Sequence, residues 1–80
     1  MTDVIKLTFG QKAVGLTFNP SGDDRVAECK QAFADIIDAL HTLRVTAPIG
    51  SEVGRLASVA ITEAQTAQMW AVKALTCRED

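Results

Sequence analysis

Apolar residues recur at steps of three and four through the middle of the chain, which predicts a long amphipathic helix over about 22–44. The run follows the turn sequence Asn19-Pro20-Ser21, whose serine is a candidate N-cap. Asp23 and Asp24 then place negative charge in the first turn, where the helix dipole favours it. The predicted apolar face consists of Val26, Cys29, Phe33, Ile36, Ile37, Leu40 and Leu43.

A second helix is predicted over 51–77, after a short link that contains the helix breakers Pro48 and Gly50. Ser51 is its candidate N-cap, and because the link is short, the two helices should form an antiparallel hairpin. Small side chains follow one face of this helix and would let two helix backbones approach closely, at Ala57, Ala60, Ala64, Ala67, Ala71 and Ala74.

Larger apolar residues of the second helix lie off the alanine stripe, so more than one of its faces is apolar. One face can pack on the first helix, and the other needs a further partner, most simply a second subunit. The chain has 80 residues, enough for a single domain over 1–80, and domains of this size often gain stability by self-association. We therefore expect a homo-oligomer.

The N-terminal segment, residues 1–18, repeats the tripeptide Leu-Thr-Phe at 7–9 and 16–18, on either side of Gly10. Two β-prone runs around a glycine-bearing turn are typical of a β-hairpin. The expected fold class is therefore mainly α: an antiparallel two-helix hairpin preceded by a short N-terminal β-hairpin.

Catalytic and metal chemistry find no support in the sequence. His41 is the only histidine, without a nucleophile at a suggestive spacing, and Cys29 and Cys77 lack spaced metal-ligand partners, so we expect free thiols. We predict no enzyme activity, no catalytic residue, no cofactor and no metal. A net charge of −2 disfavours a nucleic-acid polymer as partner, and neither a signal peptide nor a membrane segment is visible.

Phe18 stands directly before the start of the first predicted helix, where it can be a core residue or can stack a nucleobase. Free N–H groups at that helix start could receive a phosphate, with Arg25 or Lys30 as a nearby cation. The polar run 62–68 of the second helix is either a solvent stripe or a row of hydrogen-bonding groups that touches a subunit junction or a ligand.

The stretch 63–74, Glu-Ala-Gln-Thr-Ala-Gln-Met-Trp-Ala-Val-Lys-Ala, resembles the end of the phage-encoded sponge proteins that disarm bacterial CBASS and Thoeris immunity. In that family a helical hairpin ends in a similar Met-Trp-Ala element followed by Lys or Arg and Ala. Phe18-Asn19-Pro20-Ser21 before a long helix is similar to the family's N-terminal half, and the resemblance covers most of residues 16–76. Phe18 stands where the family pattern has Tyr, so stacking is kept while a hydroxyl contact is lost.

The resemblance implies a phage anti-defence sponge that binds and sequesters cyclic nucleotide signals without cleaving them. CBASS-directed members are hexamers that hold cyclic di- and trinucleotides, and the expected location is the cytoplasm of the infected bacterial host. A sponge for cyclic ADP-ribose-type Thoeris signals, or a non-catalytic helical protein-interaction module, are the alternatives. The residues expected at the ligand are Phe18, Asn19, Pro20, Ser21, Arg25, Lys30 and Lys73.

Overall fold

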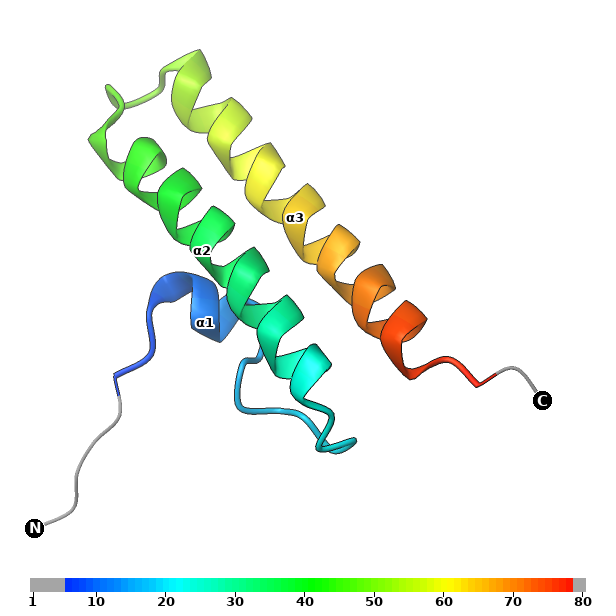
Figure 1. The fold of residues 1–80 in the computed structure, drawn as a ribbon. Helices are drawn as coiled ribbons and strands as arrows, with labels where there is room; N and C mark the ends of the chain where they lie inside the picture. Colours follow the sequence, from blue (N-terminus) through cyan, green and yellow to red (C-terminus); the bar gives the residue numbers. More distant parts are fainter. Residues whose placement is uncertain (1–5, 79–80) are drawn as a thin grey trace, which may run out of the picture.

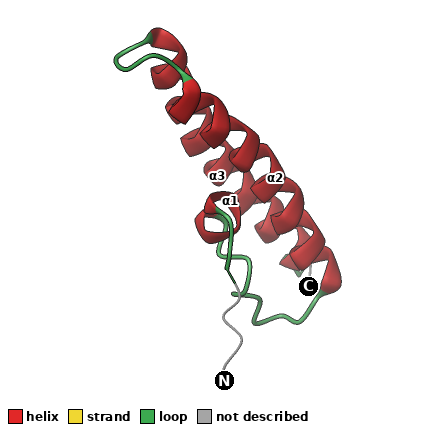
Figure 2. Cartoon of the chain, turned by 90° about the vertical axis from the view of Figure 1, so that its left-hand side faces the viewer, coloured by secondary structure: helices red, strands yellow, loops and turns green. Residues whose placement is uncertain are grey.

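A helical hairpin dominates the computed structural model, which describes residues 6–78. Three helices follow one another along the chain: α1 (Phe9–Ala13), α2 (Asp24–Thr46) and α3 (Glu52–Thr76). The two long helices lie antiparallel, and the short α1 crosses α2 (Figure 1). The loop that follows α1 then runs back to the start of α2, as a second view shows (Figure 2). The predicted antiparallel hairpin is confirmed.

Local capping sets where both long helices begin. Ser51 caps α3 as predicted, because its hydroxyl accepts from the Gly54 N–H at 3.2 Å. At α2 the predicted cap, Ser21, is wrong, and Asp23 caps the helix by accepting from the Arg25 N–H at 2.8 Å. Gly22 explains the difference, since its φ of 66° is left-handed and holds the preceding turn outside the helix. The helix expected over 22–44 accordingly runs from Asp24 to Thr46.

The predicted N-terminal β-hairpin is wrong for the described part of the segment. Residues 9–13 form α1, no strand occurs within residues 6–18, and residues 1–5 of the predicted hairpin lie outside the described residues. A capping box overrides the β propensity: the Thr8 hydroxyl accepts from the Gln11 N–H at 3.1 Å, and the Gln11 side chain accepts from the Thr8 N–H at 2.9 Å.

Close packing holds α1 against the middle of α2. The Gly10 N–H donates to Asp38 Oδ1 at 2.7 Å, and a Cβ added at Gly10 would stand 2.1 Å from the Ala34 carbonyl oxygen. Only glycine therefore permits this approach. It allows Val14, which follows α1, to join the core formed by Ala34, Ile37 and Ile61.

The alanine stripe of α3 faces α2 along only part of its length. Ala57 is buried and Ala60, Ala64 and Ala71 are half-buried, but Ala67 and Ala74 are exposed. Toward the C-terminal end of α3, covered and exposed alanines alternate, so only part of the stripe contributes to the packing. Large apolar side chains on α3 are exposed in the single chain, namely Val53, Leu56, Val59, Met69 and Trp70.

Candidate functional site

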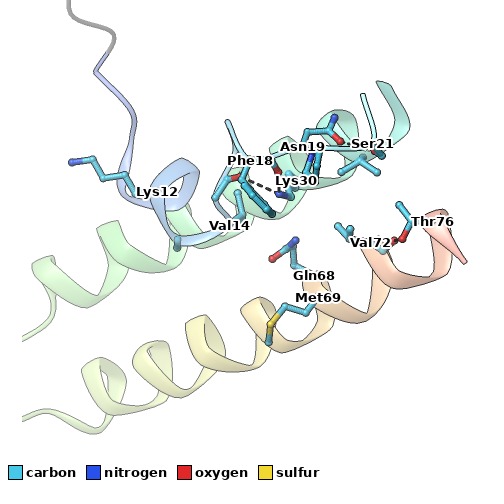
Figure 3. Close-up of a pocket in the computed structure, with 14 residues that line it drawn as sticks. Lys12, Val14, Phe18, Asn19, Ser21, Lys30, Gln68, Met69, Val72 and Thr76 are labelled. Atoms are coloured by element: carbon cyan, nitrogen blue, oxygen red, sulfur yellow. Dashed lines mark hydrogen bonds between the residues drawn. The ribbon is translucent and has the colours of Figure 1, made fainter. Parts of the chain in front are cut away.

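A cavity of about 710 Å³ lies between the loop after α1, the first half of α2 and the C-terminal half of α3 (Figure 3). Its volume falls in the range of small-molecule sites. Mostly apolar groups line it, together with a few polar side chains and two lysines. The lining residues are Lys12, Ala13, Val14, Gly15, Phe18, Asn19, Pro20, Ser21, Val26, Lys30, Gln68, Met69, Val72 and Thr76.

Phe18 lines the cavity with a ring that is largely uncovered, since the residue is 71% exposed. Its backbone is held in a turn by the bond from the Phe18 N–H to the Gly15 carbonyl, at 2.9 Å. Gly15 has a φ of 63°, a left-handed conformation that makes this turn possible. Of the two sequence interpretations, the exposed position fits a stacking residue and does not fit a core residue.

Lys30 is the buried cation of the site and is only 5% exposed. Its ammonium donates to the Gly15 carbonyl at 3.0 Å and to the Phe18 carbonyl, and lies 5.5 Å from the centre of the Phe18 ring. An ammonium has three N–H donors, so two of them secure the turn that carries Phe18. Lys30 thus joins α2 to this turn and places positive charge directly behind the aromatic ring.

Asn19, Pro20 and Ser21 form the part of the cavity wall next to the start of α2. The Asn19 side-chain amide donates to the Asp23 carbonyl at 3.0 Å, and the Ser21 hydroxyl donates to the Asn19 side-chain oxygen at 2.7 Å. These bonds fix the turn in the absence of regular structure. The structure therefore brings five of the seven predicted ligand residues to one cavity.

The other two predicted residues, Arg25 and Lys73, do not line this cavity in the single chain. Arg25 forms an ion pair with Asp23 at 2.7 Å and also reaches the Leu75 carbonyl at 3.4 Å. The hydrogen bond from Arg25 lowers the pKa of the Asp23 carboxyl below its ordinary value of 3.8. Lys73 lies on α3, where its ammonium stands 5.4 Å from the centre of the Trp70 ring.

Helix α3 contributes residues that the sequence analysis did not place at the site: Gln68, Met69, Val72 and Thr76. The polar run 62–68 was the feature of the sequence that pointed to this part of α3. Some of its residues fit the solvent stripe, and another fits the row of hydrogen-bonding groups at a ligand. Thr62, Glu63 and Thr66 are exposed, as in a solvent stripe, whereas Gln68 is 95% buried at the cavity wall. Lys12 also lines the cavity, although its side chain points away from the other labelled residues (Figure 3).

The arrangement offers stacking, hydrogen bonding and positive charge, which are the means of binding a nucleotide.

His41 is engaged elsewhere: its ring stacks on Phe9 at 4.1 Å, and its Nδ1 lies 2.8 Å from an Arg44 nitrogen. Within residues 6–78 no group of three or more His, Cys, Asp or Glu residues could hold a metal ion. None of the described helices combines the length and apolar character needed to cross a membrane.

A comparison with known families matches residues 11–76 to the family described as Acb2/Tad1, hairpin domain. The matched range includes α2, α3 and every residue of the cavity wall. Neither the curated proteins nor the solved structures gave a match.

Proposed function

We propose, because this chain belongs to the Acb2/Tad1 hairpin-domain family, that it sequesters cyclic nucleotide immune signals in the cavity beside Phe18 without cleaving them. The family is one of anti-defence sponges for cyclic nucleotides. For this chain we propose cyclic di- and trinucleotides of the CBASS type as ligands, bound in the cytoplasm of the infected bacterial host.

The exposed Phe18 ring above the buried Lys30 ammonium is the observation that carries this proposal. The uncovered ring lines the cavity, so a ligand can reach its face. A base stacked on it gains about 1–3 kcal/mol. The ammonium behind the ring and its one N–H without a carbonyl partner favour a ligand that carries phosphates.

We propose that the functional form is a homo-oligomer, a hexamer by the analogy stated above. Five large apolar residues of α3 are exposed in the single chain, and an isologous contact would bury them in pairs. A cyclic dinucleotide has two phosphates and approximate two-fold symmetry, so a two-fold interface offers each contact twice. Arg25 and Lys73, which do not line the cavity of one chain, would then add positive charge from a neighbouring subunit.

Calorimetric titration of the purified protein with cyclic di-AMP, cyclic di-GMP and cyclic ADP-ribose tests the proposal. We expect saturable binding of a cyclic dinucleotide. Heat denaturation of the complex, followed by mass spectrometry of the supernatant, should recover the ligand intact.

Three outcomes of this experiment point elsewhere. Linear products formed with turnover would contradict capture without cleavage. A protein that binds none of the three nucleotides but captures a host polypeptide would favour a protein-interaction module. Tight binding of cyclic ADP-ribose alone would assign the sponge to Thoeris-type signals.

A further inference from the structure

Gln68 is a polar side chain that the fold buries without giving it a hydrogen-bond partner. The residue is 5% exposed and lies on α3 at the cavity wall. Other glutamines are engaged: Gln11 bonds to Gln31 at 3.0 Å, and Gln65 reaches the Ala13 carbonyl at 3.4 Å. Among the described residues, the Gln68 carboxamide makes no such bond. The amide is therefore free to bond with water or with a ligand.

The Gln68 carboxamide opens into the cavity. Every fully buried side-chain nitrogen or oxygen in the described part of the chain has a hydrogen-bond partner, so the unpartnered amide of Gln68 keeps access to the cavity. Figure 3 shows the amide pointing from α3 across the cavity toward the loop of Phe18 and toward Lys30. It therefore faces the space that a base stacked on Phe18 would occupy.

We infer that Gln68 reads the edge of an adenine base in the captured ligand. This inference rests on the proposed function and names the base that the same site selects. A carboxamide presents an N–H donor beside a C=O acceptor, and adenine offers the complementary pair through its N6 amino group and N7. Adenine presents a donor beside an acceptor on its other edge as well, through N6 and N1.

Guanine fits the same wall less well. Its O6 and N7 are both acceptors and call for a fork of donors, such as Arg or Lys. Lys30 has committed two of its three N–H donors to the carbonyls of Gly15 and Phe18, so it cannot supply that fork. Guanine presents an acceptor beside a donor through O6 and N1–H on its Watson–Crick edge, but not on the N7 edge, where only adenine does, so a carboxamide that faces the N7 edge favours adenine.

Titration of the full chain and of two Gln68 variants with cyclic di-AMP and cyclic di-GMP tests the inference. The unaltered protein should bind cyclic di-AMP more tightly than cyclic di-GMP. Gln68→Met, which keeps the length and loses both hydrogen bonds, should weaken cyclic di-AMP binding about 5- to 150-fold. Gln68→Glu keeps an acceptor and loses the donor to N7, so it should also weaken binding.

Thr66→Val is the control, because Thr66 is exposed on the same helix, bonds only to the Thr62 carbonyl and does not line the cavity. It should leave the affinity for cyclic di-AMP within about twofold of the unaltered protein. The free Gln68→Met protein should melt no lower than the unaltered protein, because the amide has no partner to lose. A purely structural glutamine would instead lower the melting temperature of the free protein.

Three outcomes overturn the inference. Unchanged cyclic di-AMP affinity in Gln68→Met, with binding by the unaltered protein intact, overturns the role of Gln68 and leaves the proposed function standing. If the unaltered protein preferred cyclic di-GMP, only the choice of adenine as the base would be overturned. Absence of binding to both nucleotides overturns the proposed function for these ligands, and this inference with it.

Discussion

Lys30 shows at the residue scale how a buried charge can position a ligand-binding group. Its ammonium is removed from water, and the carbonyl oxygens of Gly15 and Phe18 compensate for the lost hydration. The same two bonds tie the turn to α2. A phosphate held by the remaining N–H would therefore contact a lysine whose position is already set, which lowers the entropic cost of binding.

Phe18→Ala should weaken binding of a cyclic dinucleotide by about 1–3 kcal/mol, the value of one stacked base. The free protein should keep its melting temperature, because the ring is mostly exposed and supports little of the core. Calorimetric titration and thermal melting of the same samples measure both effects. Phe18→Tyr, which keeps the ring, serves as the control and should retain the affinity. Unchanged affinity in Phe18→Ala would place the ligand elsewhere on the molecule.

At the scale of elements, α1 can dock closely on α2 because Gly10 has no side chain. Gly10→Ala should be strongly destabilising, because the new Cβ would overlap the backbone of α2 at the Ala34 carbonyl and must displace α1. We expect a loss of about 1–3 kcal/mol in the free energy of unfolding, measured in urea.

Gly54→Ala is the matched control for this change. A Cβ at Gly54 meets only the Ser51 hydroxyl, at an ordinary 3.6 Å, and the position lies in the first turn of α3. Alanine is the better helix former, so this variant should gain up to about 1 kcal/mol. Equal effects of the two substitutions would contradict the close approach of α1 to α2.

The start of α2 is sensitive to acid, because its cap is a carboxylate. The folded state lowers the pKa of Asp23 below 3.8, so the stabilisation is present above that value and is lost as the pH falls through the folded pKa. Asp23→Asn keeps a good N-cap but removes the charge. Between about pH 6 and about pH 3, the variant should therefore lose less melting temperature than the unaltered protein.

Glu28→Gln removes a carboxylate from the exposed side of the same helix and is the control for Asp23→Asn. Its melting temperature should follow that of the unaltered protein across the same pH range. If Asp23→Asn showed the same acid sensitivity as the unaltered protein, the stabilising contact would not be the pair of Asp23 with Arg25.

At the scale of the whole molecule, the exposed apolar residues of α3 indicate self-association. Trp70 is 66% exposed in the single chain, so its burial requires another subunit. Light scattering at micromolar concentration should give a multiple of 8.6 kDa. Trp70→Ala should shift the protein toward the single chain, with a cost of about 3–5 kcal/mol if the assembly buries the indole fully.

Ile49→Ala is the control for assembly, because Ile49 is fully exposed in the link between α2 and α3. It should leave the mass and the melting temperature unchanged. A protein with the mass of one chain at all concentrations would contradict self-association. The exposed residues of α3 would then need a partner of another kind.

Periodicity and capping made the long helices predictable from the sequence alone. Steps of three and four, the breakers Pro48 and Gly50, and the Ser51 cap act through neighbours in the chain, so they indicate a helical hairpin without knowledge of its surroundings. The family resemblance is confirmed on the same part of the chain. Phe18, Asn19, Pro20, Ser21 and Lys30 are expected at the ligand from their place at the helix start and from the family resemblance, and they line one cavity.

Tertiary packing decided the remaining features, because contacts between distant segments outweighed local preference. The β-prone stretch around Gly10 is helical because the local capping box of Thr8 and Gln11 is reinforced by docking of its backbone on Ala34 and Asp38 of α2. Lys30 and Gln68 are buried because the loop after α1 returns over the hairpin, and hydrophobic periodicity does not predict the path of that loop. The local signals of the sequence determine which segments are helices, but the path of the loop determines which polar groups lose water, and hence where a ligand can replace it.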